Sequence, residues 1–216
     1  MVKVLGKDNS VLNQFITELR DIKVQTDSMR FRKNLERVGE IFAYEISKQL
    51  EYEEKEVTTP LGSATVNVLK TWPVLATILR AGLPFHQGLL NFFDRSENAF
   101  VSSFRKHHKD GTFEVEIEYV SKPSMEGKIL ILTDPMLATG YSMGLAYREL
   151  IGEEKPLHTH IATIIASQEG VNYLKRNYSS SDITVWAGAI DDELTAQAYI
   201  VPGLGDAGDL AFGSKA

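Results

Sequence analysis

The chain has 216 residues, of which 43% are hydrophobic, and it carries a formal net charge of −6 with no cysteine. This length and hydrophobic content favour one domain with a sizeable core. The acidic charge argues against non-specific nucleic-acid binding as the main task, and the lack of cysteine excludes disulfides and thiolate metal sites. Because we find neither a signal-peptide pattern nor an apolar run of membrane-spanning length, we expect a cytoplasmic protein with no membrane contact.

The first 70 residues predict two helices followed by a β-hairpin. Apolar residues recur at helical spacing over residues 11–22 and again over residues 31–46. Polar residues that can cap these helices precede both: Asn9 or Ser10, and Asp27 or Ser28. The acidic stretch 51–56 runs directly into β-prone residues, so a solvated hairpin is favoured over an acidic interaction tail.

The first core strand is predicted at residues 74–79, and it ends at Arg80-Ala81-Gly82 before a helix over residues 83–93. A cation at the carboxyl end of a strand, followed by two small residues, allows the backbone to approach an anion closely. Without further evidence, Arg80 is better interpreted as a surface arginine than as a ligand of an anion.

A β-hairpin is predicted after this helix. Residues 99–104 form one strand, residues 105–111 form a basic tip, and the alternation of apolar residues with glutamate over residues 113–119 indicates a returning strand with one wet face. Two histidine pairs lack a further ligand at metal-binding spacing, so no protein zinc site is predicted: His107 with His108, and His158 with His160.

Residues 129–144 hold the most informative pattern in the chain. Four apolar residues predict a strand buried on both faces, which ends at Asp134 and Pro135. The loop then passes through Thr139 and Ser142 into a predicted helix. Backbone N–H groups at such a strand–loop–helix junction favour a phosphate, and the carboxylate suits the hydroxyls of a sugar that carries it. The alternative is an ordinary loop that binds nothing.

The chain continues with a strand over residues 159–166, a helix over 169–177 and a strand over 183–188. Strands and helices therefore alternate from about residue 74 to 188, interrupted by the hairpin. This order predicts an α/β fold in one domain, with an open, mainly parallel sheet flanked by helices, a β-hairpin hood and an N-terminal helical arm.

The C-terminal segment is rich in glycine. Residues 203–208 formally satisfy the dinucleotide pattern GxGxxG, but too few residues follow for a crossover helix and a second strand. Glycines packed so closely let the backbone approach a small flat ligand. A flexible C-terminal tail is disfavoured, because the sequence predicts a strand at Tyr199, Ile200 and Val201, directly before the glycines.

Three stretches resemble one known family. The sequence DPMLATGYS at residues 134–142 resembles the 5-phosphoribosyl 1-diphosphate (PRPP) loop of type I phosphoribosyltransferases and is nearly the form seen in uracil phosphoribosyltransferases. RAG at 80–82 resembles the sequence that contacts diphosphate in that family, and YIVPGLGDAGD at 199–209 closely resembles its uracil-binding segment. The resemblance spans about residues 74 to 213.

The resemblance implies functional residues. It implies PRPP binding by Arg80, Arg105, Asp134, Pro135, Met136, Leu137, Ala138, Thr139, Gly140, Tyr141, Ser142 and Asp206. It implies uracil binding by Ile200, Gly205, Asp206 and Ala207, and catalytic roles for Asp206, Arg105 and Arg80.

The resemblance also implies that the chain converts uracil and PRPP to UMP and diphosphate, with Mg²⁺ bound mainly through PRPP. It suggests a homodimer or higher homo-oligomer and GTP as an effector, while the acidic net charge leads us to expect no nucleic-acid partner. It divides the chain into N-terminal helices and β-arm (1–70), a PRPP-binding core (71–190) and a uracil-binding segment (191–216).

Four residues depart from the family pattern. Tyr141 replaces a customary glycine inside the PRPP loop, Lys106 and His107 replace acidic residues, and Leu210 replaces an arginine. Two other functions stay open from the sequence. One is a regulator that binds PRPP, a nucleotide or RNA without turnover, and the other is a phosphoribosyltransferase for another base.

Overall fold

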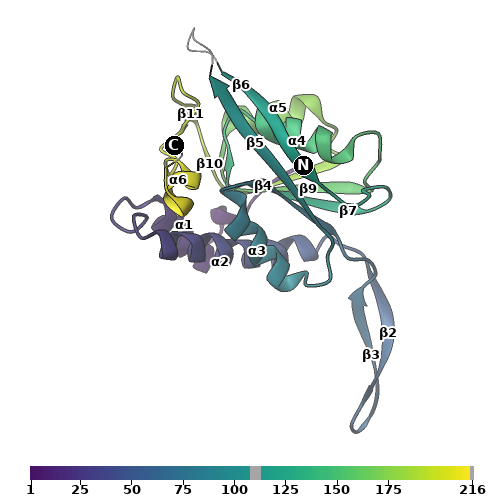
Figure 1. Cartoon of the computed structure of the whole chain (residues 1–216). Coiled ribbons are helices and arrows are strands. Elements are labelled where there is room, and N and C mark those ends of the chain that lie inside the picture. Colours follow the sequence, from purple (N-terminus) through teal and green to yellow (C-terminus); the bar gives the residue numbers. More distant parts are fainter. Residues whose placement is uncertain (108–112, 215–216) are drawn as a thin grey trace.

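The structure is a computed structural model that describes residues 1–107 and 113–214, with side chains described outside residues 103–116. A central sheet lies between two groups of helices, and a hairpin projects from the body (Figure 1). The tip residues Lys109, Asp110 and Gly111, with His108, lie outside the described residues.

The main sheet has eight strands, in the order β1-β10-β9-β7-β4-β5-β6, with β8 paired to β9. The β5–β6 pairing is antiparallel, and the other pairings in this sheet are parallel. The expected open, mainly parallel sheet is therefore confirmed. Its strands are β1 (Val2–Val4), β4 (Val74–Leu79), β5 (Asn98–His107), β6 (Phe113–Ser121), β7 (Ile129–Thr133), β8 (Met136–Leu137), β9 (His158–Ser167) and β10 (Ile183–Asp191).

The strand order reverses at β4. From β4 the chain moves to β5 on one side, and it later returns to β7 on the other side. The loops after β4 and β7 therefore leave the carboxyl edge of the sheet in opposite directions. A crevice opens at such a switch point, and ligands of open α/β sheets bind there.

Helices cover both faces of the sheet. On one face pack α1 (Val11–Arg20), α2 (Ser28–Ser47), α3 (Gly82–Phe92) and α6 (Ala207–Phe212), and on the other α4 (Tyr141–Ile151) and α5 (Gln168–Asn177). The helices α2 and α3 approach so closely that a Cβ added at Gly88 would lie 2.0 Å from the carbonyl oxygen of Glu36. No helix in residues 1–107 and 113–214 is long and apolar enough to cross a membrane.

The N-terminal segment follows the sequence prediction with two differences. Ser10 caps α1 and Asp27 caps α2, as two of the four candidates. Ile22 was expected on the apolar stripe, but α1 ends at Arg20, where Asp21 becomes extended, and Ile22 is 75% exposed. The strand β1 was not predicted, because three residues are too few to show a period.

The predicted hairpin of residues 52–69 is confirmed. It consists of β2 (Tyr52–Thr59) and β3 (Gly62–Leu69), which pair antiparallel as a sheet of their own. Its residues are mostly exposed, with Leu61 at the tip 100% exposed. It extends away from the sheet and the helices (Figure 1). A third small sheet joins β11 (Glu193–Leu194) to β12 (Ile200–Val201).

Candidate functional site

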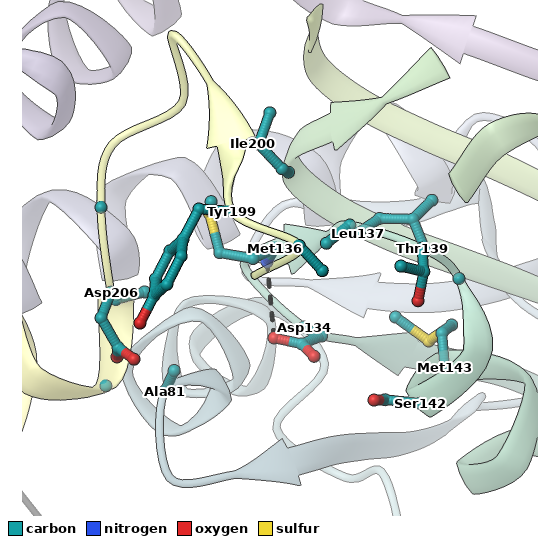
Figure 2. A pocket seen from close by; sticks show the side chains of 16 residues that line it. Ala81, Asp134, Met136, Leu137, Thr139, Ser142, Met143, Tyr199, Ile200 and Asp206 are labelled. Atoms are coloured by element: carbon teal, nitrogen blue, oxygen red, sulfur yellow. Dashed lines mark hydrogen bonds between the residues drawn. The ribbon is translucent and has the colours of Figure 1, made fainter. Parts of the chain in front are cut away.

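A pocket of about 180 Å³ opens at the carboxyl edge of the sheet, at the point where the strand order reverses. Figure 2 shows Asp134 between two walls, one carrying Thr139 and Ser142 and the other carrying Tyr199 and Asp206. The lining residues are Ala81, Asp134, Met136, Leu137, Ala138, Thr139, Gly140, Ser142, Met143, Ala198, Tyr199, Ile200, Gly205, Asp206, Ala207 and Gly208.

The first wall is the loop that leads from β7 into α4. Gly140 precedes the helix with φ of 83°, in the left-handed region where glycine is favoured. A Cβ at Gly140 would also lie 2.8 Å from the ring of Tyr173 on α5. The N–H of Tyr141 donates to Thr139 Oγ1 at 3.3 Å. The start of α4 therefore presents backbone N–H groups beside two hydroxyl side chains, an arrangement suited to a phosphate.

The back of this loop rests on the junction of β9 and α5. The fully buried Ser167 donates from Oγ to the carbonyl oxygen of Ala138 at 2.5 Å and accepts the N–H of Gly170 at 2.8 Å. A Cβ at Gly170 would lie 2.4 Å from the same carbonyl oxygen. Sequence analysis missed this support, because nothing near residues 167–170 in the sequence indicates contact with residue 138.

Asp134 lies at the base of the pocket, where β7 ends. Its Oδ1 accepts the N–H of Met136 at 3.4 Å, the dashed line in Figure 2. Burial raises the pKa of Asp134 to about 7, and the negative charge of Asp206 adds to this effect, while the Met136 N–H opposes it. The carboxyl group of Asp134 therefore titrates near neutral pH in the free protein.

The second wall is the glycine-rich C-terminal segment. Ile200 is buried, and Gly205 adopts φ of 91°. Asp206 caps α6 because its Oδ1 accepts the N–H of Asp209 at 3.0 Å. Backbone groups therefore form much of this wall, as the spacing of the glycines suggested.

Some of the predicted site residues lie apart from the pocket lining. Arg80 directs its guanidinium toward α6, where Nη2 donates to Gly213 O at 3.0 Å, and its peptide bond with Leu79 is cis. Pro135 is buried, and Tyr141 is 43% exposed. Arg105 belongs to β5, and its side chain lies outside the described ones.

The pocket also includes residues that sequence analysis did not assign. Met143 follows the predicted loop on the first turn of α4, and Gly208 lies inside the predicted uracil-binding segment 199–209, although no individual contact was assigned to it. Ala198 and Tyr199 lie in a turn where Ala198 has φ of 62°. Alanine rarely adopts this conformation, so no sequence pattern predicts it, and local hydrogen bonds with Thr195 close the turn.

The donor set suits a hard divalent cation held largely through a phosphorylated substrate. Among the described residues there is no group of three or more His, Cys, Asp or Glu side chains that could hold a metal alone. Two carboxylates, Asp134 and Asp206, border the pocket. Mg²⁺ commonly binds one or two carboxylates, substrate phosphates and water, so the pocket fits that mode.

The N-terminal helices hold the second wall in place. Arg20 on α1 donates from Nη1 to Gly203 O at 2.9 Å, and Gln25 donates to Leu204 O at 3.1 Å. Arg32 on α2 donates to Ala211 O at 2.6 Å. Sequence analysis assigned no binding residue within residues 1–70, and the structure adds that residues 20–32 support the pocket wall.

Comparison with known proteins identifies the family. A family model described as uracil phosphoribosyltransferase matches residues 6–214. A uracil phosphoribosyltransferase of Porphyromonas gingivalis is 54% identical over 98% of this chain and 97% of its own length, and one of Pyrococcus furiosus is 35% identical over 96% and 88%. The solved structure of AQ2163 protein from Aquifex aeolicus is 31% identical and covers 99% of this chain and 98% of its own, with a TM-score of 0.86. The chain therefore belongs to the uracil phosphoribosyltransferase family.

Proposed function

We propose that the protein transfers the 5-phosphoribosyl group of PRPP to uracil and releases UMP and diphosphate. The observation that carries this proposal is the meeting of two unlike walls in one pocket. The loop 138–142 suits a phosphate, and the backbone-lined segment 200–208 suits a flat base. Family membership supports the same reaction.

The first wall and Asp134 at the base of the pocket bind the ribose 5-phosphate. Backbone N–H groups of Thr139, Gly140 and Tyr141 and the hydroxyl of Ser142 hold the phosphate. The remaining proposed PRPP contacts of this loop are Pro135, Met136, Leu137 and Ala138. Asp134 accepts hydrogen bonds from the ribose hydroxyls, and this role suits a carboxylate at the base of the pocket.

The second wall selects the base. Uracil presents an acceptor, a donor and an acceptor across O2, N3–H and O4, and backbone groups of Ile200, Gly205, Asp206 and Ala207 can match this order. Cytosine reverses two of these groups, and each mismatch costs about 1–3 kcal/mol. A wall built from fixed backbone can therefore distinguish the two pyrimidines without a charged side chain.

Arg80 and Arg105 neutralise the departing diphosphate. When bound, Mg²⁺ supplies further positive charge for the diphosphate oxygens, and Asp134 and Asp206 are the carboxylates available to it. The reaction breaks the bond from ribose C1 to diphosphate and the N1–H bond of uracil, and it forms the C1–N1 bond through an oxocarbenium-like transition state, with Asp206 accepting the N1 proton. The site therefore acts by holding phosphate, ribose, diphosphate and base together and by balancing the charge that develops.

The test is UMP formation from labelled uracil with PRPP and Mg²⁺, with cytosine and hypoxanthine in parallel reactions. We expect product from uracil alone. Product from hypoxanthine instead would assign the enzyme to another base. PRPP binding without product from any base would contradict the enzyme assignment and favour the regulator.

We also propose a homodimer. The hairpin β2–β3 supports it, because an isolated two-stranded hairpin is marginally stable in water and this one projects from the body. The N-terminal arm is a second candidate contact. GTP is proposed as an effector from the family resemblance alone, and adding GTP to the uracil assay tests it, with unchanged turnover as the contradicting result.

A further inference from the structure

Arg80 joins two parts of the site that are far apart in the sequence. Its backbone follows β4, next to Ala81 of the pocket lining, while its guanidinium lies on α6. There Nη2 lies 3.4 Å from Asp209 Oδ1 and 3.0 Å from Gly213 O. The Arg80 and Asp209 side chains are 37% and 43% exposed, so a soluble anion can reach the pair.

Two nitrogens of the Arg80 guanidinium differ in their surroundings. Its Nε is buried and has no hydrogen-bond partner among the described residues, so the protein covers it. Nη2 also points toward the pocket, since a Cβ added at the lining residue Gly208 would lie 3.9 Å from Nη2 and 3.2 Å from Asp206 Oδ1. The nitrogen that Asp209 engages therefore lies beside the pocket, within reach of an anion bound there.

A diphosphate and a carboxylate compete for the same N–H donors, because both are anions that accept charge-assisted hydrogen bonds from a guanidinium. We propose that Asp209 is a positioning residue that holds the Arg80 guanidinium on α6 in the free enzyme and yields it to the diphosphate group of PRPP. This inference rests on the proposed function, since it assumes that Arg80 binds diphosphate.

The competition weakens binding of diphosphate both as part of PRPP and as the released product. The pair is partly exposed and its closest contact is long, so its effect has the size of an exposed ion pair. Removing the charge of Asp209 is expected to tighten diphosphate binding about two- to five-fold. The KM for uracil does not change, because the uracil wall does not include the Asp209 side chain.

The decisive variant is Asp209→Asn. It keeps the backbone hydrogen bonds of residue 209. The N–H of this residue donates to Asp206 Oδ1, and its carbonyl oxygen accepts the N–H of Gly213. Diphosphate affinity is measured by calorimetry with Mg²⁺, and KM is measured separately for PRPP and uracil. The expected result is tighter diphosphate, a lower KM for PRPP, an unchanged KM for uracil and a melting temperature within about 2 °C of the parent. Asp209→Ser replaces it if that variant does not fold.

The same substitution in an Arg80→Gln background distinguishes an effect of Asp209 through Arg80 from direct repulsion between Asp209 and the anion. If Asp209 acts through Arg80, Asp209→Asn has no effect on diphosphate affinity in that background. An equal tightening there would mean direct repulsion between Asp209 and the anion and would overturn the inference, as would unchanged or weaker diphosphate binding in the single variant. Absence of UMP formation by the parent enzyme would instead reject the proposed function, so the two failures are distinguishable.

Discussion

Arg20 and Asp191 form a two-pronged ion pair across 171 positions of the chain, with N–O distances of 2.7 and 2.8 Å. The pair also fixes Gly203, which donates its N–H to Asp191 Oδ2 at 2.9 Å and accepts from Arg20 Nη1 at 2.9 Å. Burial alone would raise the pKa of Asp191, but the bonds from Arg20 and Gly203 outweigh it and lower the pKa. The pair therefore contributes stability above the ordinary aspartate pKa and loses it as the pH falls.

Replacing Arg20 is expected to weaken uracil binding from a distance. Arg20→Met keeps the aliphatic stem but leaves the buried Asp191 carboxylate without its cation, which should cost about 1–3 kcal/mol in unfolding free energy. Because Gly203 loses the hydrogen bond from Arg20 and keeps only the one to Asp191, the KM for uracil should rise more than the KM for PRPP. Denaturant titration and initial rates measure the two effects. Arg30→Met, which removes the exposed pair with Glu18, is the control, and an equal rise in uracil KM there would contradict the argument.

Asp134 is expected to make PRPP binding depend on pH near neutrality. Its pKa of about 7 means that ionisation, which improves acceptance from ribose hydroxyls, is completed between about pH 6 and 8. Affinity for PRPP should rise over this range, and Asp134→Asn should remove that part of the rise. The phosphate groups of PRPP titrate in the same way with both proteins. The difference between the pH profiles of PRPP affinity for the parent and for Asp134→Asn therefore gives the contribution of Asp134. Identical profiles would refute the assignment.

The same carboxyl group is expected to lower stability as the pH rises. Between the ordinary value of 3.8 and about 7, the folded state of Asp134 holds a proton that the unfolded state has lost. The free energy of unfolding therefore falls as pH rises through this window, and the loss is complete above the folded pKa. Urea titrations at pH 5 and pH 8 should show a smaller decrease for Asp134→Asn than for the parent.

A side chain at Gly140 should disturb the phosphate loop. Alanine there must adopt φ of 83° and place its Cβ 2.8 Å from the Tyr173 ring, which together should cost about 2–4 kcal/mol and raise the KM for PRPP. Gly127→Ala is a matched control, because Gly127 has φ of 66° but open space around its Cβ. The difference between the two unfolding free energies measures the Tyr173 contact. Equal losses would show that this contact does not matter.

Asp206→Asn tests whether Asp206 helps the N1 proton of uracil leave. Asparagine also caps helices well, so α6 should persist. Turnover should fall by about ten- to a hundred-fold or more, while uracil affinity changes little, because a neutral amide cannot accept the proton. Steady-state rates and equilibrium uracil binding provide the comparison. Unchanged turnover would reject the role.

The hairpin prediction concerns assembly. Light scattering at micromolar concentration should give the mass of a dimer, and replacing residues 53–68 with a short glycine-serine turn should shift the mass toward the monomer. The exposed strands β2 and β3 make few contacts with their own body, so the domain itself should still fold. A monomeric parent protein would refute the dimer.

Sequence analysis located the parts of the site that local chemistry encodes. The change from apolar residues to Asp134 and then to Thr139 and Ser142 lies within one short stretch, so it predicted a strand, a loop and a helix in the correct places. The supports of the site were missed for a physical reason. Ser167 and Arg20 act on residues far away in the chain, and their hydrogen bonds exist only after the sheet has brought those residues together.

The hydrogen bond between Arg20 on α1 and Gly203 joins residues 183 positions apart, and this separation affects the order in which the pocket forms during synthesis. During synthesis the N-terminal helices leave the ribosome first, long before the segment that they anchor. When the phosphate loop has left the ribosome, the nascent chain still lacks the base-binding wall. Until Leu204 and Ala211 arrive, the apolar cluster that they share with α2 is incomplete and remains exposed to chaperones. The pocket can therefore form only after residues 198–208 have been synthesised and have docked on α1 and α2, so turnover reports that this segment is in place.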